Sequence, residues 1–229
     1  MNIEGLVRKV LDRPDFKLPD EIPFGYFFKR GLSYFLGRVR GAFIAFSLKN
    51  TTHLFVGKHV EMMCKEKINL GDHSRIDDNV KIDGLSKKGI VSGNRLKIGG
   101  MSEIICSGSI QDLGVGITFG DDCNFSEYTF FGAAGGIKIG SDVIAGQNVR
   151  FHSEEHKFHD LDILIRKQGV TRKGIRIGNN VWIGAGAVFL DGVEVGDGCV
   201  IGANAVLKGS YPKNSVIVGT PARVVKKRG

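Results

Sequence analysis

A period of six residues runs through the C-terminal part of the chain. A bulky apolar residue recurs at every sixth position, and glycine follows it in most repeats. An amphipathic helix repeats about every 3.6 residues and a half-buried strand about every two, so neither structure explains this spacing. A short strand followed by a turn does explain it, and three such units close one triangular coil with the bulky side chain pointing inward. The bulky positions are Ile177, Ile183, Phe189, Val195, Ile201 and Leu207.

The same pattern continues upstream, with interruptions, to about residue 68. Its phase slips by two residues between Phe131 and Ile139, and it is lost over residues 84–96. Glycine makes up 33 of the 229 residues, roughly twice the usual share, and residues 24–211 contain no proline. Glycine permits the unusual backbone of tight corners, and proline would remove a donor from a sheet. We therefore expect an all-β chain whose residues 68–222 form a parallel β-helix.

Charge and cysteine content indicate the kind of partner and the cellular compartment of the protein. The formal net charge of +8 favours anionic partners such as nucleic acid, a membrane surface or a phosphate-bearing cofactor. The N-terminus has no secretion signal, and the apolar stretch 42–48 is too short to cross a bilayer. We expect a cytoplasmic protein, with the inner face of the plasma membrane as the alternative. The cysteines, which lack metal or redox spacing and fit buried reduced thiols, are Cys64, Cys106, Cys123 and Cys199.

Residues 152–176 form the one long interruption of the repeat before the C-terminus. They have no six-residue pattern and are rich in charge, and they include His152, His156 and His159. Long excursions from a rigid repeat usually carry function. We therefore expect this loop to hold part of an active site.

The first 67 residues lack the repeat and are expected to be a partly helical segment. Residues 24–48 are rich in aromatic residues, and basic residues lie between them. One interpretation is a cap that seals the first coil of the solenoid. The other is a basic amphipathic surface that contacts a membrane. Residues 223–229 are expected to form a basic C-terminal tail.

Two stretches carry a family resemblance. One begins at Ile177 and reads Ile-Gly-Asn-Asn-Val-Trp-Ile-Gly-Ala-Gly-Ala-Val, and the other begins at Tyr211 and reads Tyr-Pro-Lys-Asn-Ser-Val-Ile-Val-Gly-Thr-Pro-Ala-Arg. They closely resemble the hexapeptide-repeat acyltransferases, and within them the sugar O-acetyltransferases that modify lipopolysaccharide, capsule or small sugars. The resemblance is specific over about residues 119–228, weaker over 68–118 and absent over 1–50. It implies a left-handed β-helix, a homotrimer, acetyl-coenzyme A as donor, no metal, and active sites between neighbouring subunits.

The resemblance also assigns a catalytic base. Acetyl transfer to a hydroxyl needs a group that removes the hydroxyl proton, and histidine suits this near neutral pH. In the family a loop histidine within a segment resembling Asn-His-x-Phe does this work, and residues 155–158 match that segment best. We assign the base to His156, with His152 as the first alternative and His159 as the second. Glu155 stands where the family often has Asn or Thr, and either it orients the ring or it is a solvated charge.

The donor and acceptor residues follow from the same resemblance. Trp182 is expected to line the cleft for acceptor and pantetheine, and subunit packing is its other interpretation. Small residues let a chain lie close to the backbone, so the pantetheine arm is expected beside Gly184, Ala185, Gly202 and Ala203. The basic positions expected to hold the coenzyme phosphates are Lys208, Arg223 and Lys226. The candidates for binding the acceptor are Asn124, Ser126, Glu127, Tyr128 and His152.

The activity this predicts is acetyl transfer to a sugar hydroxyl of a bacterial surface polysaccharide, either capsule or O-antigen. The aromatic, basic N-terminal segment favours a lipid-linked or polymeric acceptor over a free sugar. The alternatives are N-acetylation of an amino sugar or an antibiotic, and a scaffold without catalysis. The three loop histidines have a spacing suited to zinc only if the loop is helical, so we expect no metal. We also expect no nucleic-acid partner.

Overall fold

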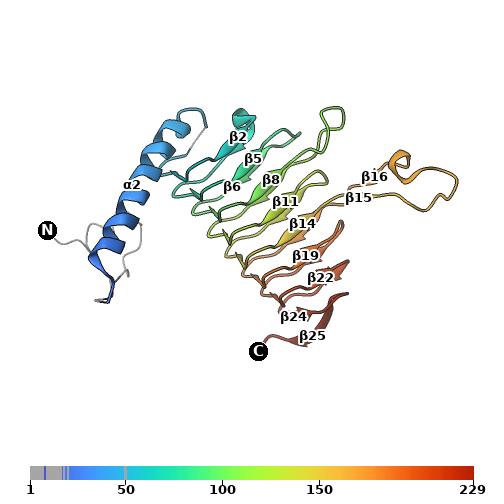
Figure 1. Cartoon of the computed structure of the whole chain (residues 1–229). Coiled ribbons are helices and arrows are strands. Elements are labelled where there is room, and N and C mark those ends of the chain that lie inside the picture. The colour runs from blue at the N-terminus through green and yellow to red at the C-terminus, as the bar shows by residue number, and fades with distance from the viewer. Residues whose placement is uncertain (1–7, 9–16, 18, 20, 49–50) are drawn as a thin grey trace.

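The computed structural model describes residues 8, 17, 19, 21–48 and 51–229. In this part of the chain, helix α2 (Phe24–Ala45) precedes a solenoid of short strands (Figure 1). The chain visits three sheets of parallel strands in turn, so strands that are neighbours in space are three strands apart in sequence, except where the long loop intervenes and at the C-terminal edge, where the last two strands pair antiparallel. The predicted all-β class and parallel β-helix are therefore confirmed.

The first sheet contains β1 (Phe55–Val56), β4 (Arg75–Ile76), β7 (Lys97–Ile98), β10 (Asn124–Phe125), β13 (Ile144–Ala145), β18 (Trp182–Ile183), β21 (Val200–Ile201), β24 (Ser215–Val218) and β25 (Arg223–Lys227). The second contains β2 (Glu61–Met63), β5 (Lys81–Asp83), β8 (Glu103–Ile105), β11 (Phe130–Gly132), β14 (Arg150–His152), β19 (Val188–Phe189) and β22 (Val206–Leu207). The third contains β3 (Ile68–Asn69), β6 (Ile90–Ser92), β9 (Ile117–Phe119), β12 (Ile137–Ile139), β17 (Ile175–Ile177), β20 (Glu194–Val195) and β23 (Ser210–Tyr211). Two short 3₁₀ helices, η1 (Lys65–Lys67) and η2 (Ile165–Lys167), lie outside the sheets.

The ends of the solenoid differ from its middle. Its strands begin at Phe55, upstream of residue 68, where the six-residue pattern begins. At the other end, β25 pairs antiparallel with β24, so Arg223–Lys227 closes the first sheet as a strand. This pairing gives the tail backbone the hydrogen bonds that an exposed sheet edge would otherwise leave unused. The division of the chain at residues 67 and 222 stays a prediction.

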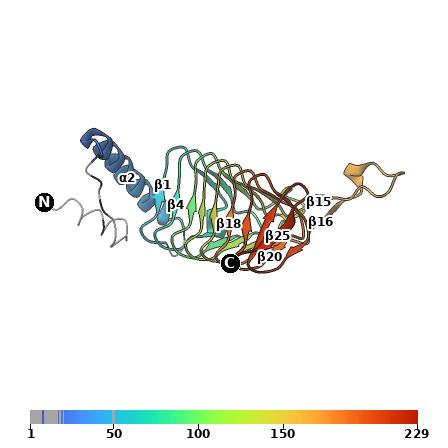
Figure 2. The same ribbon diagram turned by 90° about the horizontal axis from the view of Figure 1, so that it is seen from below.

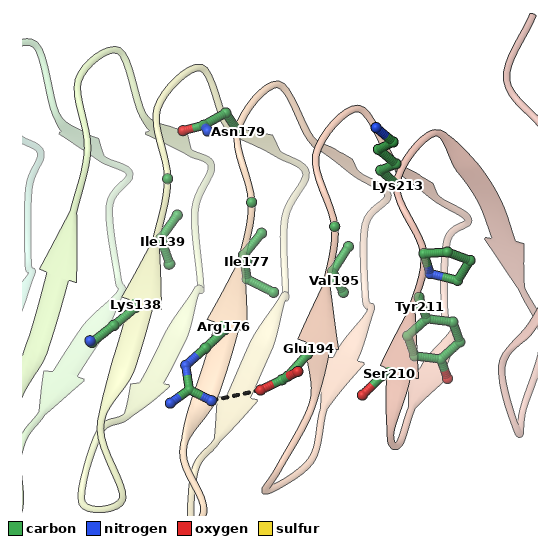
Figure 3. A pocket seen from close by; sticks show the side chains of 14 residues that line it. Lys138, Ile139, Arg176, Ile177, Asn179, Glu194, Val195, Ser210, Tyr211 and Lys213 are labelled. Atoms are coloured by element: carbon green, nitrogen blue, oxygen red, sulfur yellow. Dashed lines mark hydrogen bonds and ion pairs between the residues drawn. The ribbon is translucent and has the colours of Figure 1, made fainter.

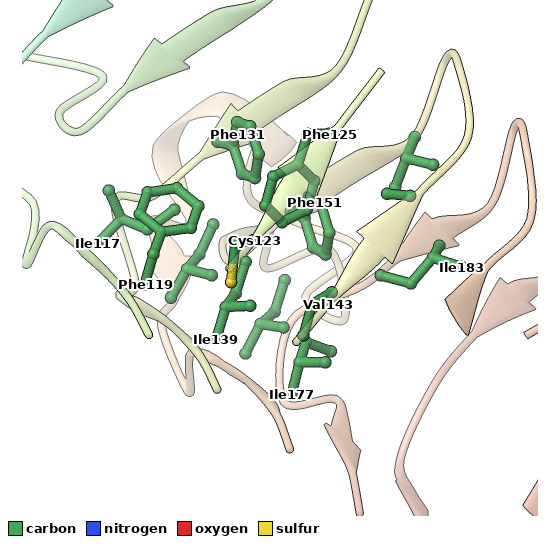
Figure 4. Packing of buried hydrophobic residues seen from close by; sticks show 14 of the residues in the cluster. Ile117, Phe119, Cys123, Phe125, Phe131, Ile139, Val143, Phe151, Ile177 and Ile183 are labelled. Carbon is green, nitrogen blue, oxygen red and sulfur yellow. The ribbon is translucent and has the colours of Figure 1, made fainter. Parts of the chain in front are cut away.

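The inward positions of the repeat fill the solenoid with large side chains. Phe125, Phe131 and Phe151 are completely buried (Figure 4), and so is Phe189. The ring of Phe151 stacks on those of Phe131 and Phe189, with centroid separations of 5.1 and 4.6 Å. In this part of the solenoid, the inward rings of neighbouring coils therefore pack directly on one another.

Side chains at the corner between the third and first sheets form a second ladder. The Ser141 amide donates to Oδ1 of Asn179 at 2.8 Å, and the Asn179 amide donates to Oδ1 of Asp197 at 2.6 Å. Asn180, the next residue, has a φ of 53°, in the left-handed region that Asn tolerates better than most residues. The Gly-Asn-Asn and Gly-Asp sequences thus make the corners that their composition predicts.

The thiols fit the core in three of four cases. Cys106, Cys123 and Cys199 are buried, whereas Cys64 is only half-buried at a corner with a φ of 52°. Burial raises the pKa of Cys106 to about 12 and that of Cys123 to about 11. These two thiols therefore stay protonated at neutral pH and serve as small core residues.

Helix α2 lies against the first coil through its small residues. A β-carbon on Gly37 would overlap the Phe55 ring, and one on Gly41 would overlap the Leu54 carbonyl. Nε of Arg40 donates to the Val56 and Gly57 carbonyls at 2.9 and 3.1 Å. Among the described residues, no helix combines the length and apolar character needed to span a bilayer.

The stacked core generates a stability prediction. Phe151→Ala removes a ring from between two others and leaves a cavity, so we expect the free energy of unfolding to fall by about 3–5 kcal/mol. Urea denaturation followed by circular dichroism measures this change. The control is Ile110→Ala, because Ile110 is 84% exposed and its truncation should shift stability by about 0.5 kcal/mol or less. Equal losses in both variants would contradict the packing described.

Candidate active site

The long loop leaves the solenoid between β14 and β17, at the corner of the second and third sheets. Ser153, which is fully buried, holds its outgoing end. The Ser153 hydroxyl donates to the Gly132 carbonyl at 2.7 Å and accepts from the Gly135 amide at 2.9 Å. The loop therefore starts from a fixed point of the preceding coil.

A buried carboxylate holds the returning end. Asp191 is only 6% exposed, and its side chain accepts the amides of Lys173 and Gly174 at 2.8–2.9 Å. Gly174 has a φ of 84°, which favours glycine at the point where the chain turns back into β17. Asp191 lies in the following coil, so that coil fixes where the loop ends.

Between these anchors the loop forms an antiparallel hairpin that projects from the solenoid (Figures 1 and 2). Its strands are β15 (Glu155–His156) and β16 (Val170–Thr171), with Glu155 opposite Thr171 and His156 opposite Val170. At the base, Arg172 forms ion pairs with Glu154 at 2.5 Å and with Asp112 at 2.8 Å. The loop is thus a braced β-hairpin, and the helical geometry that a zinc site would need is absent from these residues.

The loop histidines lie in different environments. His156 is exposed on β15, and Glu155 beside it is half-buried. His152 is half-buried on the outer face of the second sheet, with its ring centroid 5.4 Å from that of Phe130. Burial lowers the pKa of His152, and the charge of Arg150 lowers it further. His159 is exposed beside the Phe158 ring, at a centroid separation of 4.5 Å.

The candidate donor residues gather at the corner between the first and second sheets. A β-carbon on Gly184 would lie 2.5 Å from the Ala203 nitrogen, so the coils approach closely here. The amides of Gly184 and Gly202 donate to Ile201 and Ile217 of the following coil, each at 2.8 Å. Their contribution to a bound chain is therefore close approach, because their N–H groups already have partners. Ala185 and Ala203 occupy the next position of the same corner.

The candidate phosphate-binding cations lie around the last coil. Arg223 is opposite Val218 on the edge strand, and the Thr220 hydroxyl donates to the Asn204 carbonyl at 3.0 Å, which brings this segment over the Ala203 corner. Lys226 lies further along the same strand, opposite Val216. Lys208 follows β22 at a different corner.

Tyr211 links these groups and was not identified as a site residue from the sequence, where it only begins the second of the two stretches that carry the family resemblance. Its buried hydroxyl donates to the Ala222 carbonyl at 3.4 Å and accepts from the Lys208 amide at 3.2 Å. It therefore ties the backbone of Lys208 to the residue before Arg223. The only signal of this role in the sequence is the hydroxyl group that Tyr211 places at an inward position.

The acceptor candidate Asn124 and the cleft candidate Trp182 lie in one row on the first sheet. Asn124, Ile144, Trp182 and Val200 are in register along its outer face. Trp182 is 56% exposed, and the groove beside it is also lined by Asp142 and Arg228. The other acceptor candidates Ser126, Glu127 and Tyr128 follow at the adjoining corner, where Tyr128 has a φ of 61°. Within one chain, the width of the second sheet separates this row and corner from the hairpin that carries His156.

A further groove crosses the outer face of the third sheet (Figure 3). It is lined by Lys138, Arg176, Glu194, Tyr211 and Lys213 among others, and Arg176 and Glu194 form an ion pair at 2.6 Å. None of the site residues expected from the sequence lines it. The repeat gives no signal for this groove, because its charged lining side chains Lys138, Arg176 and Glu194 occupy outward positions, where the pattern sets no residue type.

Comparison with known proteins identifies the class of repeat. Residues 174–209 match the family model described as bacterial transferase hexapeptide (six repeats). An N-acyltransferase from Bacillus cereus, AntD, has a crystal structure similar to this one, with a TM-score of 0.56, 18% identity, and coverage of 83% of this chain and 89% of that chain. That likeness shows the fold alone, and with the repeat match it makes the solenoid a left-handed β-helix.

Curated relatives are more similar in sequence but match over shorter stretches. A putative lipopolysaccharide biosynthesis O-acetyl transferase of Escherichia coli is 30% identical over 48% of this chain and 60% of its own length. The galactoside O-acetyltransferase of Escherichia coli is 38% identical over 39% of this chain and 43% of its own length. A putative acetyltransferase of Schizosaccharomyces pombe is 40% identical over 51% of this chain and 55% of its own length. The chain thus spans less than two thirds of these relatives, and its predicted resemblance to hexapeptide-repeat acyltransferases is confirmed.

The anchoring of the hairpin predicts a positioning role for Asp191. Asp191→Ala leaves the Lys173 and Gly174 amides without their acceptor, which costs about 1–3 kcal/mol at a buried site. We expect faster hydrogen exchange across residues 154–173 with little change in the remaining coils, measured by mass spectrometry. Glu194→Ala is the control, because Glu194 is an exposed residue of the same coil. Unchanged exchange in Asp191→Ala would show that the carboxylate does not hold the loop.

The environment of His152 predicts a pH dependence of stability. Its pKa is lowered in the folded state, so the unfolded chain binds more protons as the pH falls below the ordinary value of about 6.5. The stabilising contribution is complete above about pH 6.5 and is lost as the pH falls through the folded-state pKa. We expect the unfolding free energy of wild type to fall more steeply below pH 6.5 than that of His152→Gln, measured by urea denaturation. His159→Gln should follow wild type, and identical slopes in all three proteins would refute the prediction.

Proposed function

We propose that this chain is an acetyl-coenzyme A-dependent O-acetyltransferase that modifies a sugar hydroxyl of a bacterial surface polysaccharide, with His156 as general base. The observation that carries the proposal is that the hairpin carrying His156 directly precedes the repeats that match the family model. The match to the transferase hexapeptide family model begins at residue 174, where the polar hairpin carrying His156 returns to the solenoid. A repeat that served only as a scaffold has no need for a hairpin anchored at both ends by buried polar side chains.

The proposed reaction needs one proton acceptor and a close pair of substrates. The unprotonated ring nitrogen of His156 removes the proton as the sugar oxygen attacks the thioester carbonyl. The carbon–sulfur bond then breaks, and the imidazolium returns the proton to the leaving thiolate. Holding both substrates in one cleft supplies much of the rate increase, because the reaction becomes effectively intramolecular. We assign Glu155 to orienting the ring.

The donor proposed is acetyl-coenzyme A, and the arrangement of the last coils supports it. Close coil packing at Gly184 and Gly202 leaves a flat corner on which the pantetheine arm can lie, next to Ala185 and Ala203. The cations proposed to bind the coenzyme phosphates are Lys208, Arg223 and Lys226, all exposed. Trp182, half-exposed on the adjoining sheet, provides an apolar surface beside the same corner. AntD was crystallised with coenzyme A, so the fold accommodates this cofactor in another protein.

The acceptor proposed is a sugar within a capsule or O-antigen, in polymeric or lipid-linked form. The names of the Escherichia coli relatives, which refer to galactoside and lipopolysaccharide O-acetyl transfer, favour a hydroxyl over an amine. The residues proposed to bind it are Asn124, Ser126, Glu127, Tyr128 and His152. Asn124 shares the outward row of Trp182, which allows one sugar ring to contact both an amide and an indole.

We also propose that the complete site forms between copies of the chain in a homotrimer. In one chain, the hairpin leaves one corner of the solenoid, and the donor corner lies across the second sheet. The hairpin tip also exposes several large apolar side chains, which a neighbouring copy would cover, at Phe158, Leu161, Ile163, Leu164 and Ile165. A neighbouring copy would thus bring His156 to a donor corner.

The test is thiol release from acetyl-coenzyme A in the presence of sugar acceptors. We expect His156→Ala to lower kcat by about 10²–10⁴-fold, since a general base contributes on that scale. His152→Ala should retain kcat within roughly tenfold and should raise KM for the acceptor. If His152→Ala abolishes turnover and His156→Ala does not, the base is His152. If wild type neither binds coenzyme A nor releases thiol with any acceptor, the enzyme proposal fails.

A further inference from the structure

The outward face of helix α2 is strongly apolar. Phe24 and Phe43 are each 75% exposed, at opposite ends of the helix. With about 100° between successive residues, the large side chains of this face fall within an arc of about 120°. The outward arc consists of Phe24, Phe28, Leu32, Phe35, Leu36, Val39 and Phe43, with Phe46 just beyond the helix end.

The docking of the helix fixes this face toward the outside. Gly37 and Gly41, which contact the first coil, lie on the opposite side of the helix from the outward arc. Tyr34 on the docked side stacks on Phe55 with a centroid separation of 5.4 Å. Rotating the helix to bury the apolar arc would replace these glycines with bulky side chains at a contact where even a β-carbon does not fit. The outward arc is therefore a property of the docked state.

The N-terminal half of α2 extends beyond the solenoid (Figures 1 and 2). Among the described residues, and apart from the neighbouring residues and the helix's own backbone, no heavy atom lies within 4 Å of the β-carbon positions of Gly25 and Gly31. The contacts described between helix and first coil involve residues from Tyr34 onward. The outward arc is thus carried on a helix that projects past the end of the first coil.

The charges of the helix identify the kind of surface it fits. Residues 24–45 contain four basic side chains and no acidic one. Lys29 and Arg30 are exposed on the projecting half, and Lys29 borders the outward arc. An apolar aromatic face bordered by cations suits the interface of a bilayer with anionic headgroups. A second copy of the same helix is a poorer partner, because pairing would bring cations together with no carboxylate to offset them.

We propose that α2 docks in the plane of an anionic bilayer surface, with its outward arc among the acyl chains and Lys29, which borders that arc, at the headgroups. The helix then holds the N-terminal end of the solenoid at the membrane. On the proposed function, this places the active site within reach of lipid-linked acceptors. The docking itself depends only on the helix and its charges.

Vesicle flotation of the full-length chain tests the proposal. The vesicles contain phosphatidylcholine alone or with about one third phosphatidylglycerol. We expect wild type to float with the anionic vesicles at least roughly tenfold more than with the neutral ones, and less in high salt. The triple variant Phe28→Ser, Phe35→Ser, Phe43→Ser should lose at least roughly tenfold of this binding, and Lys29→Glu should reduce the preference for anionic lipid.

The matched control carries the same number of serine substitutions at exposed apolar positions of the solenoid, Met63→Ser, Val91→Ser and Ile110→Ser, and should float like wild type. Thermal unfolding and thiol release with a water-soluble acceptor show whether the variants remain folded. The proposal is overturned if wild type does not float, if the helix triple variant floats like wild type, or if that variant only reduces oligomer size in sedimentation, which would indicate self-association. Flotation without any acetyl transfer would refute the proposed function and leave the docking intact.

Discussion

Backbone hydrogen bonds join each coil of this protein to the adjacent coil. The Ile144 amide donates to Val181, and the Trp182 amide donates to Cys199, each at 3.0 Å, so the first sheet is one continuous ladder. Inside the coils, stacked rings such as Phe151 on Phe189 leave no room for a coil to shift relative to its neighbours. Because contacts are made only between adjacent coils, the solenoid is a stiff rod whose outward positions are free to vary.

The functional features occur where the chain leaves this ladder. The hairpin is held by Ser153 in one coil and by Asp191 in another, so both its ends are fixed to the rod although its tip projects. The edge strand Arg223–Lys227 and the Tyr211 hydroxyl bring basic residues to the last coil in a similar way. At the opposite end, helix α2 is held against the first coil at Gly37 and Gly41. The rigid solenoid thus positions a candidate base and a candidate membrane surface on segments outside its coils, and it carries the candidate donor corner on its own turns.

The interior of the solenoid could be predicted from the sequence, because a six-residue period specifies which side chain points inward. Ile177, Ile183 and Phe189 are buried as that period predicts, and the Asn179-Asn180 corner adopts the expected backbone. The pairing of His156 with Val170 could not be predicted, since two-residue strands in a non-repeating loop carry no periodic signal. The Asp191 contacts and the contact of Tyr211 with Ala222 also escaped prediction, because they join residues more than ten positions apart in the chain. Of the site, residue types and corners were accessible from the sequence, whereas the assembly that we propose for them depends on contacts between chains.

A crystal structure of the protein with bound coenzyme A would test the central claim most directly. If a rigid solenoid delivers the hairpin imidazole to a donor corner of a neighbouring copy, the coenzyme sulfur should lie within about 4 Å of a His156 ring nitrogen. The phosphates should then lie near Arg223 and Lys226. A coenzyme bound in the groove of the third sheet, or a sulfur distant from every His156 in the assembly, would contradict the account.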